Sequence, residues 1–115
     1  MSRKQPVILG VGHCCQDYIC TVEAYPPEDG STHILSIDDS QGGGAVATAL
    51  TAAARLGAKA RILCRLGDDE TGDRILKGFS DFGVDTSLVT RVPGLETGIE
   101  TISPAQGSSI RSTLA

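Results

Sequence analysis

Short apolar runs separated by turns rich in glycine and proline are the main pattern along this chain. Pro6 to Gly12 is a continuous apolar run, which is typical of a strand that is buried on both faces. Residues 17–25 and 32–40 alternate between apolar and polar positions and predict two more strands. We expect the second of these at a sheet edge, because more of its side chains are polar. The proline- and glycine-containing segment 26–30 between them predicts a turn.

The first helix is predicted from Ala45 to Leu56, a segment with nine apolar residues out of twelve. Its polar residues Thr48, Thr51 and Arg55 are three and four positions apart, so they share one stripe of the helix surface. We therefore expect the rest of this helix to be covered on most sides. Gly57, directly after the segment, supplies the left-handed residue that ends a helix.

The second half of the chain alternates between strand and helix. Lys59 to Leu66 is a predicted strand, and the acidic turn after it suits the start of a helix from about Thr71 to Phe82. A helix of this length between two strands favours parallel pairing of the strands. The sequence therefore predicts an α/β fold, with a few strands leaving the main sheet as a separate flap. The remaining expectations are burial of Ile75, Leu76, Phe79 and Phe82, a helix end at Gly83, an extended or irregular segment over 84–92, and short strands at 97–103 and 110–114.

Composition and charge indicate one folded domain and exclude several kinds of partner. A length of 115 residues fits one ordinary domain, and 40% hydrophobic against 21% charged residues favours a folded chain over disorder. The formal net charge is −4 and no Lys/Arg cluster occurs, so we expect no nucleic-acid partner and no membrane-surface partner. No apolar run approaches the ~18–20 residues of a membrane-spanning helix. No secretory cleavage pattern follows the first residues.

The four cysteines, Cys14, Cys15, Cys20 and Cys64, favour a reducing compartment. Cys14 and Cys15 are adjacent, which is poor geometry for a disulfide, and three of the four lie in apolar, strand-like segments. We expect reduced core cysteines in a cytoplasmic protein. His13 beside Cys14 and Cys15 raises the alternative of a zinc site. Because the chain has no C-x-x-C pair and no matching second half, we predict no metal site.

Glycine motifs that bind phosphate or metal ions are incomplete or absent. Gly10-Val11-Gly12 lacks the third glycine and the following helix of a dinucleotide site. No P-loop occurs in the sequence. The turn from Gly67 to Gly72 lacks the ligand spacing of an EF-hand, so the start of a capped helix explains it better.

The candidate ligand-binding residues are Gly42-Gly43-Gly44, Thr48 and Asp17. Three residues without a Cβ allow backbone N–H groups to reach a polar ligand at a helix N-terminus, and a flexible joint before the helix explains them equally well. Thr48, in the first helical turn, either directs its hydroxyl at the same ligand or is simply exposed. Asp17 lies just past the first strand, where a carboxylate accepts hydrogen bonds from ligand hydroxyls. A solvated loop carboxylate is the alternative.

In their order along the chain, these segments resemble the PfkB/ribokinase family of carbohydrate kinases from about residue 7 to 103. The resemblance rests on the order and spacing of several motifs rather than on any one of them. The matching motifs are Gly10-x-Gly12 leading to Asp17, Gly42-Gly43-Gly44-x-x-Ala47-Thr48, Ala52-Ala53-Ala54-Arg55-Leu56-Gly57, Arg65-Leu66-Gly67-Asp68-Asp69-x-x-Gly72 and Phe82-Gly83-Val84-Asp85-Thr86.

The resemblance implies a ribokinase-like, doubly wound α/β domain with a small β-flap lid, of which residues 1–115 form only the N-terminal part. Lid strands would lie at about 18–24, 32–40 and 97–103, and lids of this kind often pair two subunits in a homodimer. Members of the family use ATP and Mg²⁺ to phosphorylate a sugar hydroxyl. The substrate-binding residues implied in this chain are Asp17 for the sugar hydroxyls, with Gly42, Gly43, Gly44 and Thr48 around the same ligand.

Two departures from the family pattern narrow this expectation. Thr48 stands where the family usually has an Asn that contacts the sugar, which resembles the sulfofructose kinase branch. The family's catalytic G-A-G-D run and its ATP site lie far downstream and do not occur in these residues. We therefore expect the sugar-binding portion of an ATP-dependent carbohydrate kinase, inactive by itself. The alternatives are a non-catalytic sugar-binding or scaffolding module derived from this fold, and an unrelated α/β protein that pairs through its strands and binds nothing.

Overall fold

The chain folds into two compact units. The computed structural model describes residues 4–104 and 113–114. The first unit, which we name the α/β unit, comprises Met1–Gln16 and Gly42–Gly98. The second, the β unit, comprises Asp17–Gln41 and Ile99–Ala115. This division confirms that a few strands separate from the main sheet.

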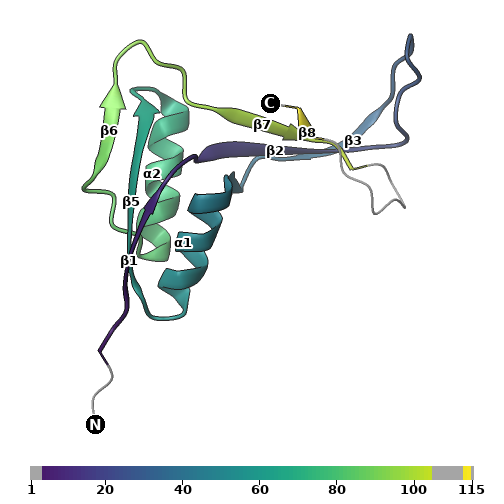
Figure 1. Ribbon diagram of the computed structural model, residues 1–115. Coiled ribbons are helices and arrows are strands. Elements are labelled where there is room, and N and C mark those ends of the chain that lie inside the picture. The colour runs from purple at the N-terminus through teal and green to yellow at the C-terminus, as the bar shows by residue number, and fades with distance from the viewer. Residues whose placement is uncertain (1–3, 105–112, 115) are drawn as a thin grey trace. The chain divides into compact units, whose positions relative to one another are not determined.

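The α/β unit contains a three-stranded parallel sheet in the order β1-β5-β6 (Figure 1). The register of β1 on β5 pairs Gly10 with Ile62, and that of β5 on β6 pairs Cys64 with Val89. The predicted parallel pairing is therefore confirmed. The elements of this unit are β1 (Val7–Val11), β4 (Gly42–Gly43), α1 (Ala45–Arg55), β5 (Lys59–Gly67), α2 (Glu70–Phe82) and β6 (Val89–Val92).

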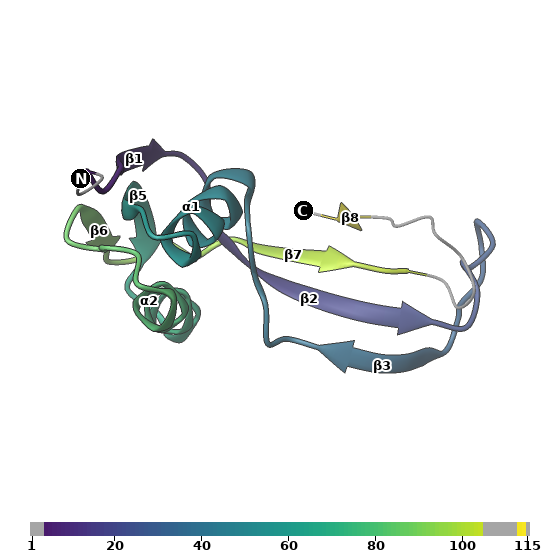
Figure 2. The ribbon, with the colours of Figure 1, turned by 90° about the horizontal axis from the view of Figure 1, so that it is seen from below.

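Both helices pack on the same face of this sheet. Ala60, Ile62 and Leu66 alternate along β5, are almost fully buried, and belong to the same core cluster as residues of α1 and α2. Figure 2 shows α1 and α2 beside this one face. The helix residues in the cluster are Ala47 and Leu50 from α1 and Ile75 and Phe79 from α2. Side chains of a strand alternate between two faces, so β1 and β5 also present side chains on the face away from α1 and α2. No helix among the described residues packs on that second face.

Two predictions about helix burial are wrong. Phe82, at the end of α2, is 42% exposed and lies under the Arg55 guanidinium at 5.1 Å from its ring centroid. In α1 only Ala47 and Leu50 are buried, and Leu56 just beyond it is 90% exposed. Periodicity therefore located the apolar face of each helix, but the described chain covers less of that face than the sequence suggested. Neither helix is long and apolar enough to cross a membrane, within the described residues.

The N-terminus of α2 is fixed by a hydrogen-bond network centred on Asp69. Its carboxylate accepts from the backbone N–H of Gly72 at 2.8 Å, as an N-cap, and from the backbone N–H and hydroxyl of Thr97 at 2.8 and 2.6 Å. The buried Thr97 hydroxyl in turn accepts from the N–H of Gly67 at 2.9 Å. Arg91 donates to the carbonyl of Gly67 at 2.9 Å. The capped helix start predicted at this turn is confirmed, and α2 ends at Gly83 with φ 80° as expected.

We expect Asp69→Asn to weaken the dependence of stability on acidic pH. Hydrogen bonds from Thr97, then from Gly72, hold the pKa of Asp69 below its ordinary value. The ionised carboxylate therefore stabilises the fold above its unfolded-state pKa of about 4, and this contribution is lost as the pH falls through the lower folded-state pKa. Urea unfolding between about pH 7 and pH 3 should show a lower midpoint for the variant at neutral pH and a smaller fall on acidification.

Asp81→Asn is the matched control, because it removes an exposed carboxylate of α2 whose partner among the described residues is Lys77, at 2.8 Å. Some acid dependence should persist in both variants, since hydrogen bonds also lower the pKa of Asp38 and of Asp85. A fall in the Asp69→Asn midpoint as steep as that of the wild type would show that the network does not couple stability to pH.

The β unit is built on antiparallel pairing. β2 pairs with β3 in a register that opposes Ile19 to Asp38, with an irregularity at Thr21/Val22, and β7 pairs with β8. The strand order is β3-β2-β7-β8, so β3 lies at an edge as predicted. The predicted strand at 110–114 lies partly outside the described residues, and its described part is β8. The strands are β2 (Cys15–Val22, beginning in the α/β unit), β3 (Ile34–Asp38), β7 (Ile99–Ile102) and β8 (Thr113–Leu114).

Candidate functional site

The glycine run before α1 includes a short strand. Gly42 and Gly43 form β4, which pairs antiparallel with the first residues of β2, Gln16 opposite Gly42 and Cys15 opposite Gly43. Gly43 is buried and Gly42 is exposed. A two-residue strand has too short a pattern to be predicted, and the sequence analysis missed it.

Gly44 is held in a conformation and a space that only glycine fits. Its φ of 101° and ψ of 137° lie in a region that residues with a Cβ rarely adopt. A Cβ at this position would lie 2.5 Å from the carbonyl oxygen of His13 and 2.9 Å from the Cα of Cys14. The glycine therefore allows the backbone before α1 to approach the segment between β1 and β2.

The first turn of α1 presents backbone donors and one hydroxyl. Gly44 provides the N-cap without a side-chain hydrogen bond, and no acidic residue lies in this turn. The positive end of the helix dipole is thus not balanced by a carboxylate of the helix itself. The Thr48 side chain is exposed, whereas the Thr51 hydroxyl donates to the carbonyl of Ala47 at 2.8 Å. This end of the helix is suited to oxygen atoms of a polar ligand, with the Thr48 hydroxyl as an additional partner.

Asp17 follows β1 and lies inside β2, in agreement with the strand predicted over 17–25, and so it is not at the carboxyl end of a strand. β1 ends at Val11, and Asp17 is the third residue of β2, with its backbone N–H donating to the carbonyl of Gln41 at 3.0 Å. Asp17 is partly buried and belongs to the β unit. The other candidate residues, from Gly42 to Gly44 and Thr48, lie together in the α/β unit.

The thiols of Cys14 and Cys64 are core groups rather than candidate nucleophiles. Their sulfur atoms are 3.5 Å apart, and Cys14 belongs to the core cluster. Burial, with further contributions from Cys64, raises the pKa of Cys14 to about 12, and burial also raises the pKa of Cys64. Both thiols are therefore protonated at neutral pH, which disfavours attack on a substrate and thiolate binding of a metal. All four cysteines are free in the structure.

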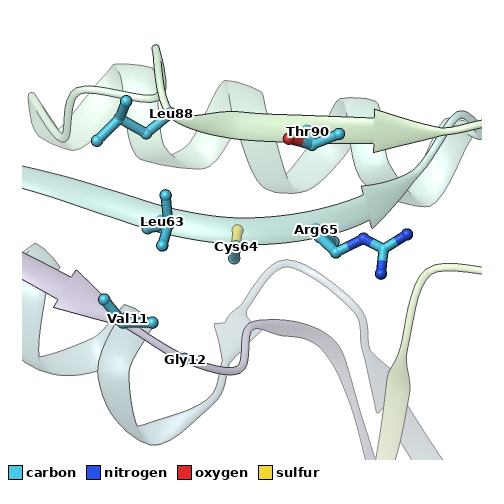
Figure 3. A pocket seen from close by; sticks show the side chains of 7 residues that line it. All are labelled: Val11, Gly12, Leu63, Cys64, Arg65, Leu88 and Thr90. Atoms are coloured by element: carbon cyan, nitrogen blue, oxygen red, sulfur yellow. The ribbon is translucent and has the colours of Figure 1, made fainter.

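A hollow in the α/β unit was not predicted from the sequence. It has a volume of about 450 Å³ and lies where β1, β5 and the start of β6 meet (Figure 3). Its walls are mainly apolar, with Arg65 and Thr90 as the polar contributors. Val11 and Gly12 in its lining belong to the apolar run 6–12, which the sequence analysis interpreted as a strand buried on both faces. The lining residues are Val11, Gly12, Leu63, Cys64, Arg65, Leu88 and Thr90.

Comparison with known protein families shows to which family this chain belongs. The family model described as pfkB family carbohydrate kinase matches residues 6–111, which is most of the chain. The chain belongs to the pfkB family. The family membership predicted from the ordered motifs is thus confirmed. The match does not test the resemblance of Thr48 to the sulfofructose kinase branch.

Curated proteins with similar sequences include ribokinases. The ribokinase of Bacillus subtilis is 32% identical over 102 residues, which cover 89% of this chain and 34% of that protein. The bifunctional ribokinase/ribose-5-phosphate isomerase A of Fructilactobacillus sanfranciscensis is 34% identical over 91 residues, which cover 79% of this chain and 17% of that protein. The chain thus spans about a third or less of the length of these relatives.

Solved structures of similar fold also include ribokinases. A putative ribokinase from Agrobacterium tumefaciens has a TM-score of 0.80 and 29% identity, with 97% of this chain and 37% of that chain covered. Ribokinase from Cryptococcus neoformans, in complex with ADP, has a TM-score of 0.84 at 21% identity, with 96% and 34% covered. The α/β, ribokinase-like fold is therefore confirmed for this part of a pfkB domain.

Proposed function

We propose that this chain is the N-terminal, sugar-binding portion of an ATP-dependent carbohydrate kinase. The family match over residues 6–111 carries the proposal, because it covers both units and every motif that the sequence analysis singled out. In this reading the whole enzyme transfers a phosphoryl group from ATP to a hydroxyl of a sugar. The structure of Arabidopsis thaliana ribokinase in complex with ribose and ATP, 23% identical with a TM-score of 0.79, supports a small sugar as the class of acceptor.

The acceptor would be bound by Asp17, by the backbone from Gly42 to Gly44, and by Thr48. A carboxylate accepts hydrogen bonds from two hydroxyls, which suits the vicinal diols of a sugar. Backbone N–H groups at the start of α1 donate to sugar oxygens, and the Thr48 hydroxyl does either. The resemblance of Thr48 to the sulfofructose kinase branch implies a ketose-like or modified sugar.

ATP and Mg²⁺ would be held by parts of the kinase that this chain does not span. The acidic turn before α2 does not fit a metal site, because both carboxylate oxygens of Asp69 already accept hydrogen bonds from Gly72 and Thr97. Structural relatives solved with ADP or ATP support nucleotide use by the whole enzyme. When bound, the metal would balance the negative charge of the transferred phosphoryl group.

The β unit would form the lid of the sugar site, with strands around 18–24, 32–40 and 97–103. Its edge strand β3 exposes Ile34, Leu35 and Ile37, which supports pairing of two lids in a homodimer. Free cysteines throughout support a cytoplasmic location. A non-catalytic sugar-binding module with the same residues remains the second candidate function, since it needs the sugar site alone.

Titration of the isotope-labelled chain with ribose and with fructose, followed by NMR, tests the sugar site. We expect saturable shifts of the amide signals of Asp17, Gly43, Gly44 and Thr48, and no saturable shift with ATP. Asp17→Asn should weaken the sugar affinity by about tenfold or more, the usual cost of losing a hydrogen bond to a charged group. Asp29→Asn, which changes an exposed carboxylate of the same unit, should leave the affinity unchanged.

The outcomes of this titration separate the alternatives. Saturable sugar shifts that Asp17→Asn does not weaken would remove Asp17 from the site. A chain that shows no saturable shift with any sugar, but forms dimers, would match the unrelated strand-pairing protein and contradict the proposal. Sugar binding in a chain that never gains activity when the rest of a kinase is supplied would favour the non-catalytic module.

A further inference from the structure

Two cysteine thiols from distant parts of the sequence are in contact inside the α/β unit. Cys14 lies in the connection between β1 and β2, and Cys64 lies on β5. Their Sγ atoms are 3.5 Å apart, in a thiol–thiol hydrogen bond that either sulfur can donate. Both cysteines are free in the structure. The fold therefore holds two thiols side by side, although 50 positions separate them along the chain.

This contact makes a covalent bond between the two sulfur atoms geometrically accessible. A disulfide has a sulfur–sulfur distance of about 2.05 Å, so the two atoms need to approach by roughly 1.5 Å. Cys14 belongs to no named strand, and its side chain and backbone can therefore adjust without breaking a strand pairing. Closure of the bond needs a local adjustment and no change of fold.

Cys64 is the more accessible of the two thiols. It is partly buried and lines the hollow of about 450 Å³ beside β1, β5 and β6 (Figure 3). Cys14 is 6% exposed and belongs to the core cluster. Because the hollow has mainly apolar walls, it suits a small uncharged oxidant such as hydrogen peroxide. The geometry thus makes Cys64 the thiol that reacts with the oxidant and Cys14 the thiol that closes the bond.

We propose that Cys14 and Cys64 form a reversible disulfide when a peroxide oxidises the chain, so that the pair is a redox-sensitive cross-link of the α/β unit. The Cys64 sulfur attacks one peroxide oxygen, the O–O bond breaks, and a sulfenic acid and one water form. The Cys14 sulfur then attacks the Cys64 sulfur, the S–O bond breaks, and the hydroxyl group leaves with the Cys14 proton as a second water. Two thiols are oxidised to one disulfide, and the peroxide is reduced to two waters. A reducing thiol restores the pair by exchange, and the proposal does not depend on the sugar site.

Oxidation of this pair should be slow. Burial raises the pKa of Cys14 to about 12 and also raises the pKa of Cys64, so little of either thiol is the reactive thiolate at neutral pH. Fast peroxide sensors have cysteines of low pKa, and this pair differs from them. The contact at 3.5 Å matters in the second step, where it favours closure by Cys14 over further oxidation of Cys64. We therefore expect the disulfide after sustained exposure to peroxide.

The cross-link would restrain the connection against which the glycine run packs. A Cβ built on Gly44 lies 2.9 Å from the Cα of Cys14, so the two backbones are in direct contact. A bond from Cys14 to β5 also closes a loop that contains α1, which reduces the conformational freedom of the unfolded chain. The oxidised chain should therefore unfold at a higher urea concentration than the reduced chain, and dithiothreitol should reverse the difference.

Peptide mapping of the oxidised 115-residue chain tests the proposal. The folded chain is incubated with hydrogen peroxide, and the remaining thiols are blocked with an alkylating reagent. Trypsin cleaves after Lys and Arg, so Cys64 falls in the peptide 62–65 and the other three cysteines fall in the peptide 5–55. We expect these two peptides to be joined until dithiothreitol separates them. Fragmentation of the joined peptides in the mass spectrometer should locate the bond at Cys14.

Cys64→Ala and Cys20→Ala are matched variants, because each removes a partly buried cysteine of a strand. Cys64→Ala should abolish the cross-link, whereas Cys20→Ala should retain it. Circular dichroism of the reduced variants separates loss of the bond from loss of folding, and the fragmentation of the wild-type peptides needs no variant. A bond located at Cys15 or Cys20 would overturn the proposal. So would oxidation of Cys64 to a sulfinic acid without a cross-link, or a cross-linked chain that is no more resistant to urea than the reduced chain.

Discussion

The purified 115-residue chain should release no ADP from ATP and Mg²⁺ in the presence of sugars. Phosphoryl transfer depends on holding the nucleotide, the metal ion and the acceptor hydroxyl in line, with an aspartate that accepts the hydroxyl proton. The chain spans about a third of its ribokinase relatives, and the candidate residues that it contains all concern the acceptor. Binding one of three components leaves the transfer uncatalysed, so the expected rate is that of the buffer blank.

A coupled assay of ADP release, run with ribose and with fructose, measures this directly. Full-length Bacillus subtilis ribokinase in the same buffer shows that the assay detects a working enzyme of the family. ADP release that depends on sugar, scales with the amount of chain and disappears in Asp17→Asn would contradict the expectation. Because a trace of a host kinase also releases ADP, the Asp17→Asn chain prepared in parallel serves as the control for contamination.

The helices and the main strands were predictable because their signals are local. The acidic turn that starts α2 and the glycine that ends it, Gly83, were predicted from the sequence, and in the structure Asp69 of this turn is the N-cap. The short strands were harder. β4 consists of two glycines, and β6 is four residues with polar Thr90 and Arg91 among them, so neither has a pattern that periodicity detects. Their strand structure comes from pairing with β2 and β5, which is a tertiary effect.

Burial was predicted less well than secondary structure. Phe82 and Leu56 belong to apolar helical patterns, but both are exposed in the described chain. A pattern shows which side of an element is apolar, and it does not show whether another element is present to cover that side. Val7, Leu9 and Val11 illustrate the same point on β1, where a run typical of a doubly buried strand is covered on one face. The family comparison supplies the missing context, because most of the relatives' length lies outside this chain.

The sequence analysis selected the candidate site residues by their type, but it did not give the structural reason for each of them. The glycine run was noticed because it opens a helix, and either a ligand or a flexible joint seemed to explain it. The structure gives Gly44 a third reason, the close approach to His13 and Cys14. Asp17 was selected for its position after the first strand, and its place within β2 agrees with the strand predicted over 17–25. Such roles depend on contacts between segments far apart in the sequence, which spacing alone does not reveal.

Gly44→Ala should destabilise the α/β unit far more than Gly42→Ala. The backbone conformation of Gly44 costs about 1–3 kcal/mol for a residue with a Cβ. The new Cβ would also lie 2.5 Å from the carbonyl oxygen of His13, and neither atom belongs to a flexible side chain that moves aside. Together these effects predict a loss of roughly 3 kcal/mol or more in the free energy of unfolding.

Gly42→Ala separates this effect from a general need for glycine in the run. Among the described residues, a Cβ at Gly42 would meet the carbonyl oxygen of Cys15 alone, at an ordinary contact distance of 3.7 Å, and the position has no positive φ. We expect this variant to stay within about 1 kcal/mol of the wild type in urea unfolding. Equal losses for the two variants would mean that β4 needs glycine for its pairing and not for the approach at Gly44. If Gly42→Ala is stable but no longer binds sugar, the exposed residue Gly42 is part of the ligand site. The NMR titration measures sugar binding independently of stability.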